Sequence, residues 1–266
     1  TQGFSIQLSQ YYGAKDFENL RKSLAHSYRL TAFIAAGVLI LSQSFASLVL
    51  TGLHTPSNII GMSLLYLRII FCGIPATAAY NMFASALRAM GNSKTPLTAM
   101  IIASVLNVSL DILFVAGFGW GVAGAAIATV IAQSFSAVYC FLILRRIDIV
   151  HLTRADFMPA SGMNARLMKL GIPVVFQNII IGVGGLVVQY VINGYGFLFV
   201  AGFTATNKLY GLLEMAAISY GYAIVTYVGQ NLGAGKIDRI RKADEGEYIE
   251  SDYIPSSRFN IDDMYK

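Results

Sequence analysis

The chain has 266 residues, of which 56% are hydrophobic and only 12% are charged, and its mean hydropathy is +0.60. Soluble domains carry about 25% charged residues, and here positions 30–67 and 170–207 contain none. This composition excludes a soluble globular protein. It predicts an all-α, polytopic bundle of transmembrane helices, because about 20 apolar residues in a helix cross a membrane.

Turn residues divide the apolar sequence into successive helices. A partial helix is predicted over residues 1 to about 12, and because the chain starts inside an apolar stretch, we expect the beginning of that span to lie outside the chain. Six full spans follow, at about residues 30–53, 58–87, 96–118, 121–144, 170–193 and 199–232. Gly, Pro, Asn and Ser fill the short connections, as is typical of turns.

The loops between these spans alternate in charge. The uncharged loops are 51–57, 117–121 and 193–196, and the loops between them are cationic. The cationic side chains are Lys15, Arg21, Lys22, Arg29, Arg88, Lys94, Arg145, Arg146, Arg154, Arg166, Lys169, Lys236, Arg239, Arg241 and Lys242. Cationic loops stay in the cytoplasm, so the pattern predicts a multi-pass protein of the plasma membrane. The same loops explain the net charge of +5 without a nucleic-acid partner.

A short segment occurs twice. Residues 10–22 (QYYGAKDFENLRK) align without gaps with residues 230–242 (QNLGAGKIDRIRK), and Gln, Gly, Ala, Arg and Lys are identical. Each copy follows an apolar span and enters a cationic loop. A parallel repeat of this kind is typical of secondary carriers built from two like halves, although basic inner loops can also match by chance. Its period predicts about six spans in each half.

Asp111 is one of two acids within the apolar spans, where an ionisable group is costly and usually marks an ion or substrate path. Asn107 lies on the same helical face, and counting 1.5 Å per residue from the turn brings Thr129 to a similar depth. Their oxygens predict a Na⁺ site at Asp111, Asn107 and Thr129. A carboxylate in apolar surroundings equally predicts a proton carrier. The alternative is a structural hydrogen-bond cluster that joins two helices.

Glu214 is the second acid within a span. Tyr210 and Asn207 lie on its helical face, whereas Lys208 does not. These three residues predict a second polar site in the membrane, and the alternative is a structural Glu that faces water or a partner.

An enzyme is not predicted. The sequence contains no Gly-rich phosphate loop, no Ser/His/Asp set and no metal-spaced His/Cys cluster. Cys72 and Cys140 fall within apolar spans and are expected to be buried as small hydrophobic residues. No cofactor is expected apart from a coupling ion.

Several motifs occur in the order in which one transporter family carries them. They are residues 66–75 (YLRIIFCGIP), 86–96 (ALRAMGNSKTP), 106–111 (LNVSLD) and 121–129 (GVAGAAIAT). With the repeated segment, they resemble the multidrug and toxic compound extrusion (MATE) transporters over about residues 1–243. The resemblance implies a two-lobed antiporter of twelve helices. Such a protein expels organic cations, drugs or metabolites, and is driven by inward Na⁺ or H⁺.

The resemblance also implies roles for single residues. Asn107 and Asp111 match the family's Asn-x-x-x-Asp pair on its fifth helix, Thr129 matches a hydroxyl of the sixth, and Tyr66 matches a tyrosine of the fourth. Together they are similar to the family's cation site in the N-terminal lobe. The expected partners are small organic cations and membrane lipid.

The family pattern predicts four regions. Residues 1–150 correspond to the N-terminal lobe (helices 2–6), 151–165 to a cytoplasmic linker, and 166–243 to the start of the C-terminal lobe (helices 7 and 8). Residues 244–266 form an acidic tail without a span, which is expected to be flexible. The family's first helix and last four helices are expected to be missing from this truncated chain.

Two other functions stay open at this point. One is a flippase of the same superfamily that moves lipid-linked saccharides, which would favour more cationic residues than Arg68 and Lys208 within the spans. The other is a non-functional membrane fragment, which the unusual tail favours. The sequence does not distinguish Na⁺ from H⁺ coupling, identify the exported compound or give the oligomeric state.

Overall fold

The computed structural model describes residues 2–52, 57–158 and 162–244, and the predicted acidic tail lies outside them from position 245 onward. Within these ranges the chain is helical and has no strand. The helices are α1 (Gln2–Gly13), α2 (Phe17–Gly52), α3 (Ile60–Cys72), α4 (Ile74–Ala89), α5 (Lys94–Asp111), α6 (Gly121–Leu144), α7 (Met163–Asn193), α8 (Phe197–Gly233) and α9 (Ile237–Asp244). A π-helical segment, η1 (Ile112–Gly117), follows α5, and two short 3-10 helices, η2 (Asp148–Val150) and η3 (Arg154–Phe157), follow α6.

The described part of the chain contains six helical stretches that are long and apolar enough to cross a membrane. They are Phe17–Gly52, Ile60–Ala89, Lys94–Gly117, Gly121–Leu144, Met163–Ile192 and Phe199–Gly233. These stretches contain the six predicted spans apart from a few residues at their ends, and α1 occupies the predicted partial one. The predicted all-α transmembrane bundle is therefore confirmed.

Helix α2 begins earlier than its apolar sequence predicted, at Phe17 instead of near residue 30. Its first turn is capped, because the Asn19 amide donates a hydrogen bond to Asp16 Oδ1 at 3.1 Å. Leu20 and Leu24 are each 1% exposed. This extension is amphipathic, with one face in the core and polar side chains on the other, so it does not appear as an apolar run.

The linker that follows α6 packs against this extension of α2. Both ring nitrogens of His26, which is 2% exposed, lie within hydrogen-bond distance of linker atoms, Nδ1 at 2.7 Å from Asn164 Oδ1 and Nε2 at 3.1 Å from the Met158 carbonyl. Arg29 donates to the Phe157 carbonyl at 3.0 Å. The linker is thus held on the bundle by polar contacts, not only by its two ends.

The span at residues 60–89 is divided into α3 and α4 by Gly73 and Pro75. Pro75 lies in the first turn of α4, where a backbone N–H would have no partner within the helix, so the proline costs no hydrogen bond. A Cβ on Gly73 would lie 2.9 Å from Val130 Cγ2, so the glycine lets this break approach α6 closely. Cys72, at the end of α3, is exposed and not buried as predicted, whereas Cys140 is buried.

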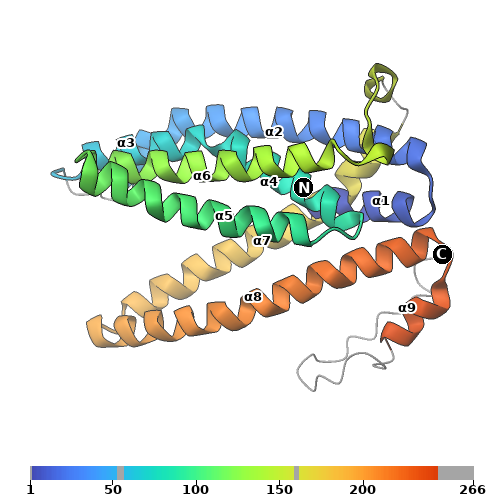
Figure 1. Ribbon diagram of the computed structural model, residues 1–266. Helices are drawn as coiled ribbons and strands as arrows, with labels where there is room; N and C mark the ends of the chain where they lie inside the picture. Colours follow the sequence, from blue (N-terminus) through green and yellow to red (C-terminus); the bar gives the residue numbers. More distant parts are fainter. Residues whose placement is uncertain (1, 53–56, 159–161, 245–266) are drawn as a thin grey trace.

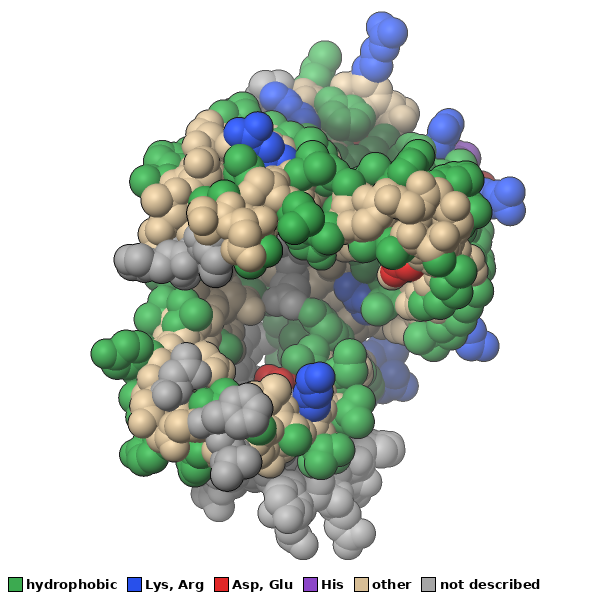
Figure 2. Space-filling view, turned by 90° about the vertical axis from the view of Figure 1, so that its left-hand side faces the viewer, with side chains coloured by type: hydrophobic (Ala, Val, Ile, Leu, Met, Phe, Trp, Pro, Cys, Tyr) green, Lys and Arg blue, Asp and Glu red, His purple; other side chains and the backbone are tan. Residues whose placement is uncertain are grey.

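The helices form two groups that meet at one end. Figure 1 shows α2–α6 as one bundle and α7 with α8 as a hairpin that diverges from it, with α1 between the groups where they meet. The turns from α1 to α2 and from α8 to α9 lie at this end, and its cationic residues predict that it is the cytoplasmic one. Seen from the opposite, outer end, the surface is hollowed between the two groups (Figure 2).

The two copies of the repeat have the same local structure. Helix α1 ends at Gly13 and α2 begins at Phe17, while α8 ends at Gly233 and α9 begins at Ile237. The equivalent Lys15 and Gly235 both have positive φ, at 57° and 69°. The Ala14 and Ala234 amides donate to the Gln10 and Gln230 carbonyls at 2.9 and 3.0 Å. The repeat predicted from the sequence is thus also a structural one.

The same glycines hold the two groups together. A Cβ on Gly13 would lie 1.9 Å from the Gln230 carbonyl oxygen, and a Cβ on Gly233 would lie 1.9 Å from the Gln10 carbonyl oxygen. The contact is therefore reciprocal, as expected where two like segments cross at a two-fold axis. Gln230 Nε2 also donates to the Ala89 carbonyl at the end of α4, at 2.8 Å. Both glycines are required because backbone approaches backbone directly.

Candidate functional site

The hairpin of α5 and α6 positions the predicted cation site. Gly119 and Gly121 have φ values of 69° and 54°, which lets the chain reverse within a few residues. The rings of Phe114 and Trp120 stack across the turn with centroids 5.0 Å apart. Gly124 packs against Phe114, whose Cβ would lie 2.9 Å from an added Cβ. These contacts set the register between the two helices.

In this register Asn107 lies opposite Thr129. The two side chains are 3.5 Å apart between Asn107 Nδ2 and Thr129 Oγ1, at the limit of a hydrogen bond. Thr129 Oγ1 in turn donates to the Ala125 carbonyl at 3.0 Å. The depth estimate from the sequence placed Asp111 opposite Thr129. Asp111 follows Asn107 by one turn, so it lies about 6 Å nearer the outer end.

Asp111 has a buried carboxylate oxygen without a partner. Its Oδ1 atom is inaccessible to solvent and accepts no hydrogen bond from any residue that the structure describes. Asp111 is also the last α-helical residue before the π-helical segment, and π-helical turns are frequent at functional sites. A buried unsatisfied acceptor costs about 1–3 kcal/mol, more when it is charged, and a cation, a proton or water at this oxygen would remove that cost.

Tyr66 is the fourth predicted member of the site, and the structure does not join it to the other three. It lies on α3 with a side chain that is 38% exposed. Helix α3 packs against α6, which carries Thr129. Among the described residues, however, no hydrogen bond connects Tyr66 with Asn107, Asp111 or Thr129.

The second predicted polar site consists of Glu214, Tyr210 and Asn207. All three lie on the continuous helix α8, so the predicted helical spacing is correct. Their side chains are exposed, and within the described ranges no hydrogen bond or ion pair involves them. The structure therefore aligns these residues on one helix without giving them a partner from another helix.

A polar pair next to the cation site was not predicted. Thr77 of α4 donates a short hydrogen bond to Gln133 Oε1 of α6. Gln133 follows Thr129 by one helical turn, so the pair continues the polar face of α6 towards the cytoplasm. The i, i+4 spacing of Thr129 and Gln133 on one face of a largely apolar helix was the available signal.

The donor set around Asp111 fits a hard monovalent cation. Asp111, Asn107 and Thr129 can each supply an oxygen ligand, with one negative charge between them, and hard cations prefer oxygen ligands. No group of three or more His, Cys, Asp and Glu side chains that could hold a transition metal occurs among the described residues. A proton on Asp111 would satisfy the same charge, because neutralising a buried carboxylate removes its desolvation cost.

Known proteins match this chain over most of its length. The family model MatE matches residues 1–113 and 173–243. The probable multidrug resistance protein YpnP of Bacillus subtilis (strain 168) is 33% identical over 233 residues, which cover 88% of this chain and 52% of YpnP. The multidrug export protein MepA of Staphylococcus aureus (strain NCTC 8325 / PS 47) is 24% identical over 237 residues, 88% of this chain and 52% of MepA. The chain thus spans about half the length of these relatives.

Solved structures show the same fold. A MOP superfamily transporter from Pyrococcus furiosus Vc1 (DSM3638) is similar with a TM-score of 0.85 and 21% identity, over 92% of this chain and 55% of that one. A MATE family transporter in an outward-facing conformation gives a TM-score of 0.80 at 19% identity, with the same coverage. The helices and the relatives identify a multi-pass protein of the plasma membrane. Motifs, family model and fold agree, and the chain belongs to the MatE family, the multidrug and toxic compound extrusion family.

Proposed function

We propose that the protein is a secondary active transporter that exports organic cations, drugs or metabolites in exchange for inward Na⁺ or H⁺. The buried, unpartnered oxygen of Asp111 beside Asn107 and Thr129 carries this proposal. A coupling cation or proton would bind that oxygen in one conformation of the transporter and dissociate from it in the other. The names of YpnP and MepA, a probable multidrug resistance protein and a multidrug export protein, support drugs as the exported class.

The mechanism follows from the difference between these states. Binding of a cation or proton to Asp111 removes the cost of a buried charge and changes how α5 packs on α6. A ligand shifts a conformational equilibrium only by its differential affinity for the two states. Asp111 would therefore bias the two helix groups between outward-open and inward-open arrangements, as in carriers built from two like halves.

The test is transport by the protein in proteoliposomes loaded with ethidium. We expect a Na⁺ gradient at constant pH, or a pH gradient without Na⁺, to drive ethidium export. Asp111→Asn should reduce the driven rate by about tenfold or more, because coupling energies of about 1–3 kcal/mol correspond to such factors. The matched control is Asp148→Asn, an exposed acid in η2. Driven export by Asp111→Asn at the wild-type rate under both gradients would refute the role of Asp111.

A further inference from the structure

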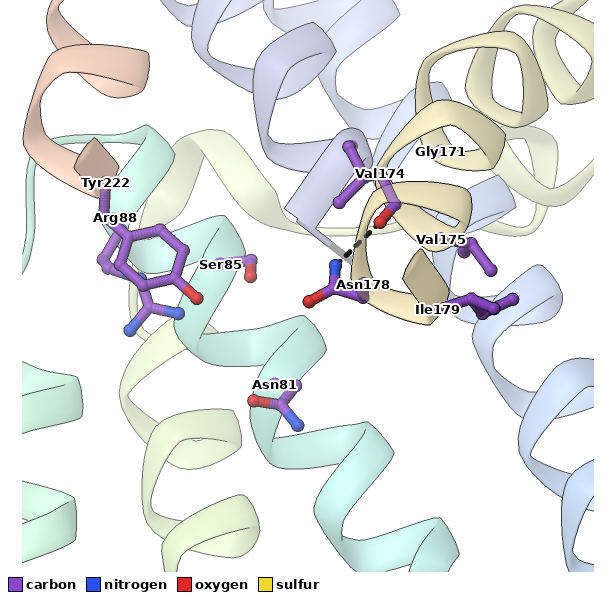
Figure 3. A pocket seen from close by; sticks show the side chains of 10 residues that line it. Asn81, Ser85, Arg88, Gly171, Val174, Val175, Asn178, Ile179 and Tyr222 are labelled. Atoms are coloured by element: carbon purple, nitrogen blue, oxygen red, sulfur yellow. Dashed lines mark hydrogen bonds between the residues drawn. The ribbon is translucent and has the colours of Figure 1, made fainter. Parts of the chain in front are cut away.

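A cavity of about 460 Å³ lies between the two groups of helices. Side chains from α4, α7 and α8 line it, together with Gly3 of α1 and Gly171 of α7, which pack against each other. Figure 3 shows Asn81, Ser85 and Arg88 on α4 on one side and Asn178 of α7 on the other. None of these residues belongs to the Asp111 site, which lies within the hairpin of α5 and α6.

The wall of the cavity formed by α4 is polar and carries a positive charge on Arg88. Asn81, Ser85 and Arg88 are spaced by four and three residues, so they share one face of α4. Arg88 is the only charged side chain that lines the cavity among the described residues. Its guanidinium carbon lies 5.0 Å from the centre of the Tyr222 ring of α8, so the cation is held at the junction of the two groups.

Arg88 interacts with the Tyr80 hydroxyl and has no acidic partner among the described residues. The salt bridges among the described residues join Arg21 with Asp156 and Lys22 with Glu18, and neither involves Arg88. Arg88 is partly buried, so water screens its charge incompletely. A planar guanidinium presents donors that match a carboxylate or a phosphate in two parallel hydrogen bonds. The cavity therefore offers a cation with donors to an anion, and no acid lines it among the described residues.

The opposite wall is mostly apolar. Val174, Val175 and Ile179 of α7 line this side. Asn178 lies on this side too: its Nδ2 donates to the Val174 carbonyl at 2.7 Å, and Figure 3 shows its oxygen directed towards α4. A ligand that fills the cavity thus meets a cation on the α4 side and, apart from one amide, hydrocarbon on the α7 side, which matches an amphiphilic anion.

We propose that this cavity is a second binding site, which takes the carboxylate or phosphate group of an amphiphilic molecule. The oxyanion pairs with Arg88, and the apolar part of the molecule lies along Val174, Val175 and Ile179. The ligand is either an anionic lipid of the surrounding membrane or a soluble amphiphilic acid, because both carry the same oxyanion. This site is separate from Asp111 and does not depend on export of cations.

The test is binding of dansyl-undecanoic acid to the purified protein in nanodiscs of phosphatidylcholine. The comparison ligand is its methyl ester, which has the same shape without the charge, and signal from empty nanodiscs is subtracted. We expect the acid to bind about tenfold more tightly than the ester, since hydrogen bonds to charged groups correspond to factors of this size. This comparison needs no variant and therefore does not depend on folding of a mutant.

Variants then locate the site. Arg88→Gln should weaken binding of the acid by about tenfold and leave the ester unchanged, and Arg88→Lys should recover part of the loss by restoring the charge. Arg146→Gln is the matched control, because Arg146 is an exposed arginine that does not line this cavity. Equal binding of acid and ester by the wild type, or unchanged binding of the acid by Arg88→Gln, would overturn the proposal.

Competition distinguishes the two sources of the oxyanion. If the ligand is a lipid, replacing part of the phosphatidylcholine with phosphatidylglycerol should displace the acid at constant ionic strength. If it is a soluble acid, octanoate should displace the probe, while phosphatidylglycerol should have little effect. Failure of both to displace the probe would also refute the site, because the oxyanion would then not be what the cavity recognises.

Discussion

Polar side chains inside the helices differ in how they are satisfied. Ser44, Ser109 and Thr204 donate to the carbonyl four residues earlier, at 2.8 Å in each case, which satisfies a hydroxyl within its own helix. Thr77 is paired with Gln133 of another helix. Asp111 Oδ1 accepts a hydrogen bond neither from its own helix nor from another helix among the described residues. Four other buried atoms of the described residues also lack a partner, namely Gln7 Oε1, Ser23 Oγ, Ser27 Oγ and Thr31 Oγ1. Only Asp111 Oδ1 belongs to a group that can carry a charge, and this distinguishes it as the candidate ion site.

His26 gives a prediction about stability at a single residue. His26→Ala removes both polar contacts of a buried ring with the linker, at Asn164 and Met158. The linker should then detach more often, at a cost of about 2 kcal/mol or more. The rate of proteolysis follows the population of the form in which the linker is detached. Trypsin should therefore cut after the exposed Arg154 at least about tenfold faster than in the wild type. Mass spectrometry of the digested, purified protein measures this rate.

The control for this prediction is His151→Ala. His151 is exposed, and its Nε2 lies 3.0 Å from a single acceptor, the Arg145 carbonyl. Its removal should leave the cleavage rate within about twofold, since exposed hydrogen bonds contribute little. A similar rate for both variants would show that His26 does not hold the linker.

At the level of helices, the repeat explains how the two groups meet. Gly13 and Gly233 occupy equivalent positions, and each packs directly against the backbone of the other copy. Ser9 and Gly229 are also equivalent, and here only one copy is a glycine: a Cβ on Gly229 would lie 1.9 Å from Ser9 Oγ. The crossing is therefore symmetric in its backbone and asymmetric in the side chains that fill it.

This crossing predicts the effect of adding one methyl group. Gly13→Ala and Gly233→Ala should each lower the thermal midpoint of the purified protein, since overpacking costs about 1–3 kcal/mol. Gly211→Ala is the matched control on α8, where an added Cβ would meet nothing within 4 Å. The midpoint is measured by loss of monodisperse protein after heating. If Gly13→Ala, Gly233→Ala and the control have the same thermal midpoint, the close contact of α1 and α8 does not stabilise the protein.

At the scale of the whole molecule, the direction of the helices in the membrane follows from the cationic loops. With Cys72 and Cys140 replaced by serine, Tyr195→Cys should react in intact cells with a maleimide that does not cross membranes. Arg146→Cys should react only after the membrane is permeabilised, because it lies in a cytoplasmic loop. Both positions are exposed, so a difference in labelling reports the side of the membrane and not burial. The reverse pattern would invert the orientation.

The sequence predicted the spans and the repeat because both depend on local properties. A membrane helix requires a long apolar run whatever surrounds it, and the equal spacing of Gln10 to Phe17 and Gln230 to Ile237 is a local pattern. The amphipathic start of α2 at Phe17 was missed because its apolar face is visible only against the core. The family and the Asp111 candidate were likewise available from the residues alone.

Only the tertiary structure decided which side chains meet. The register of α5 on α6 depends on the glycine turn and the π-helical segment, and it places Asn107, not Asp111, opposite Thr129. The sequence assigned Arg88 to a cytoplasmic loop, and the crossing of α1 with α8 placed it beside Tyr222 in a cavity between the two groups. Helix packing sets these contacts between residues far apart in the chain, so hydropathy and local spacing do not contain them.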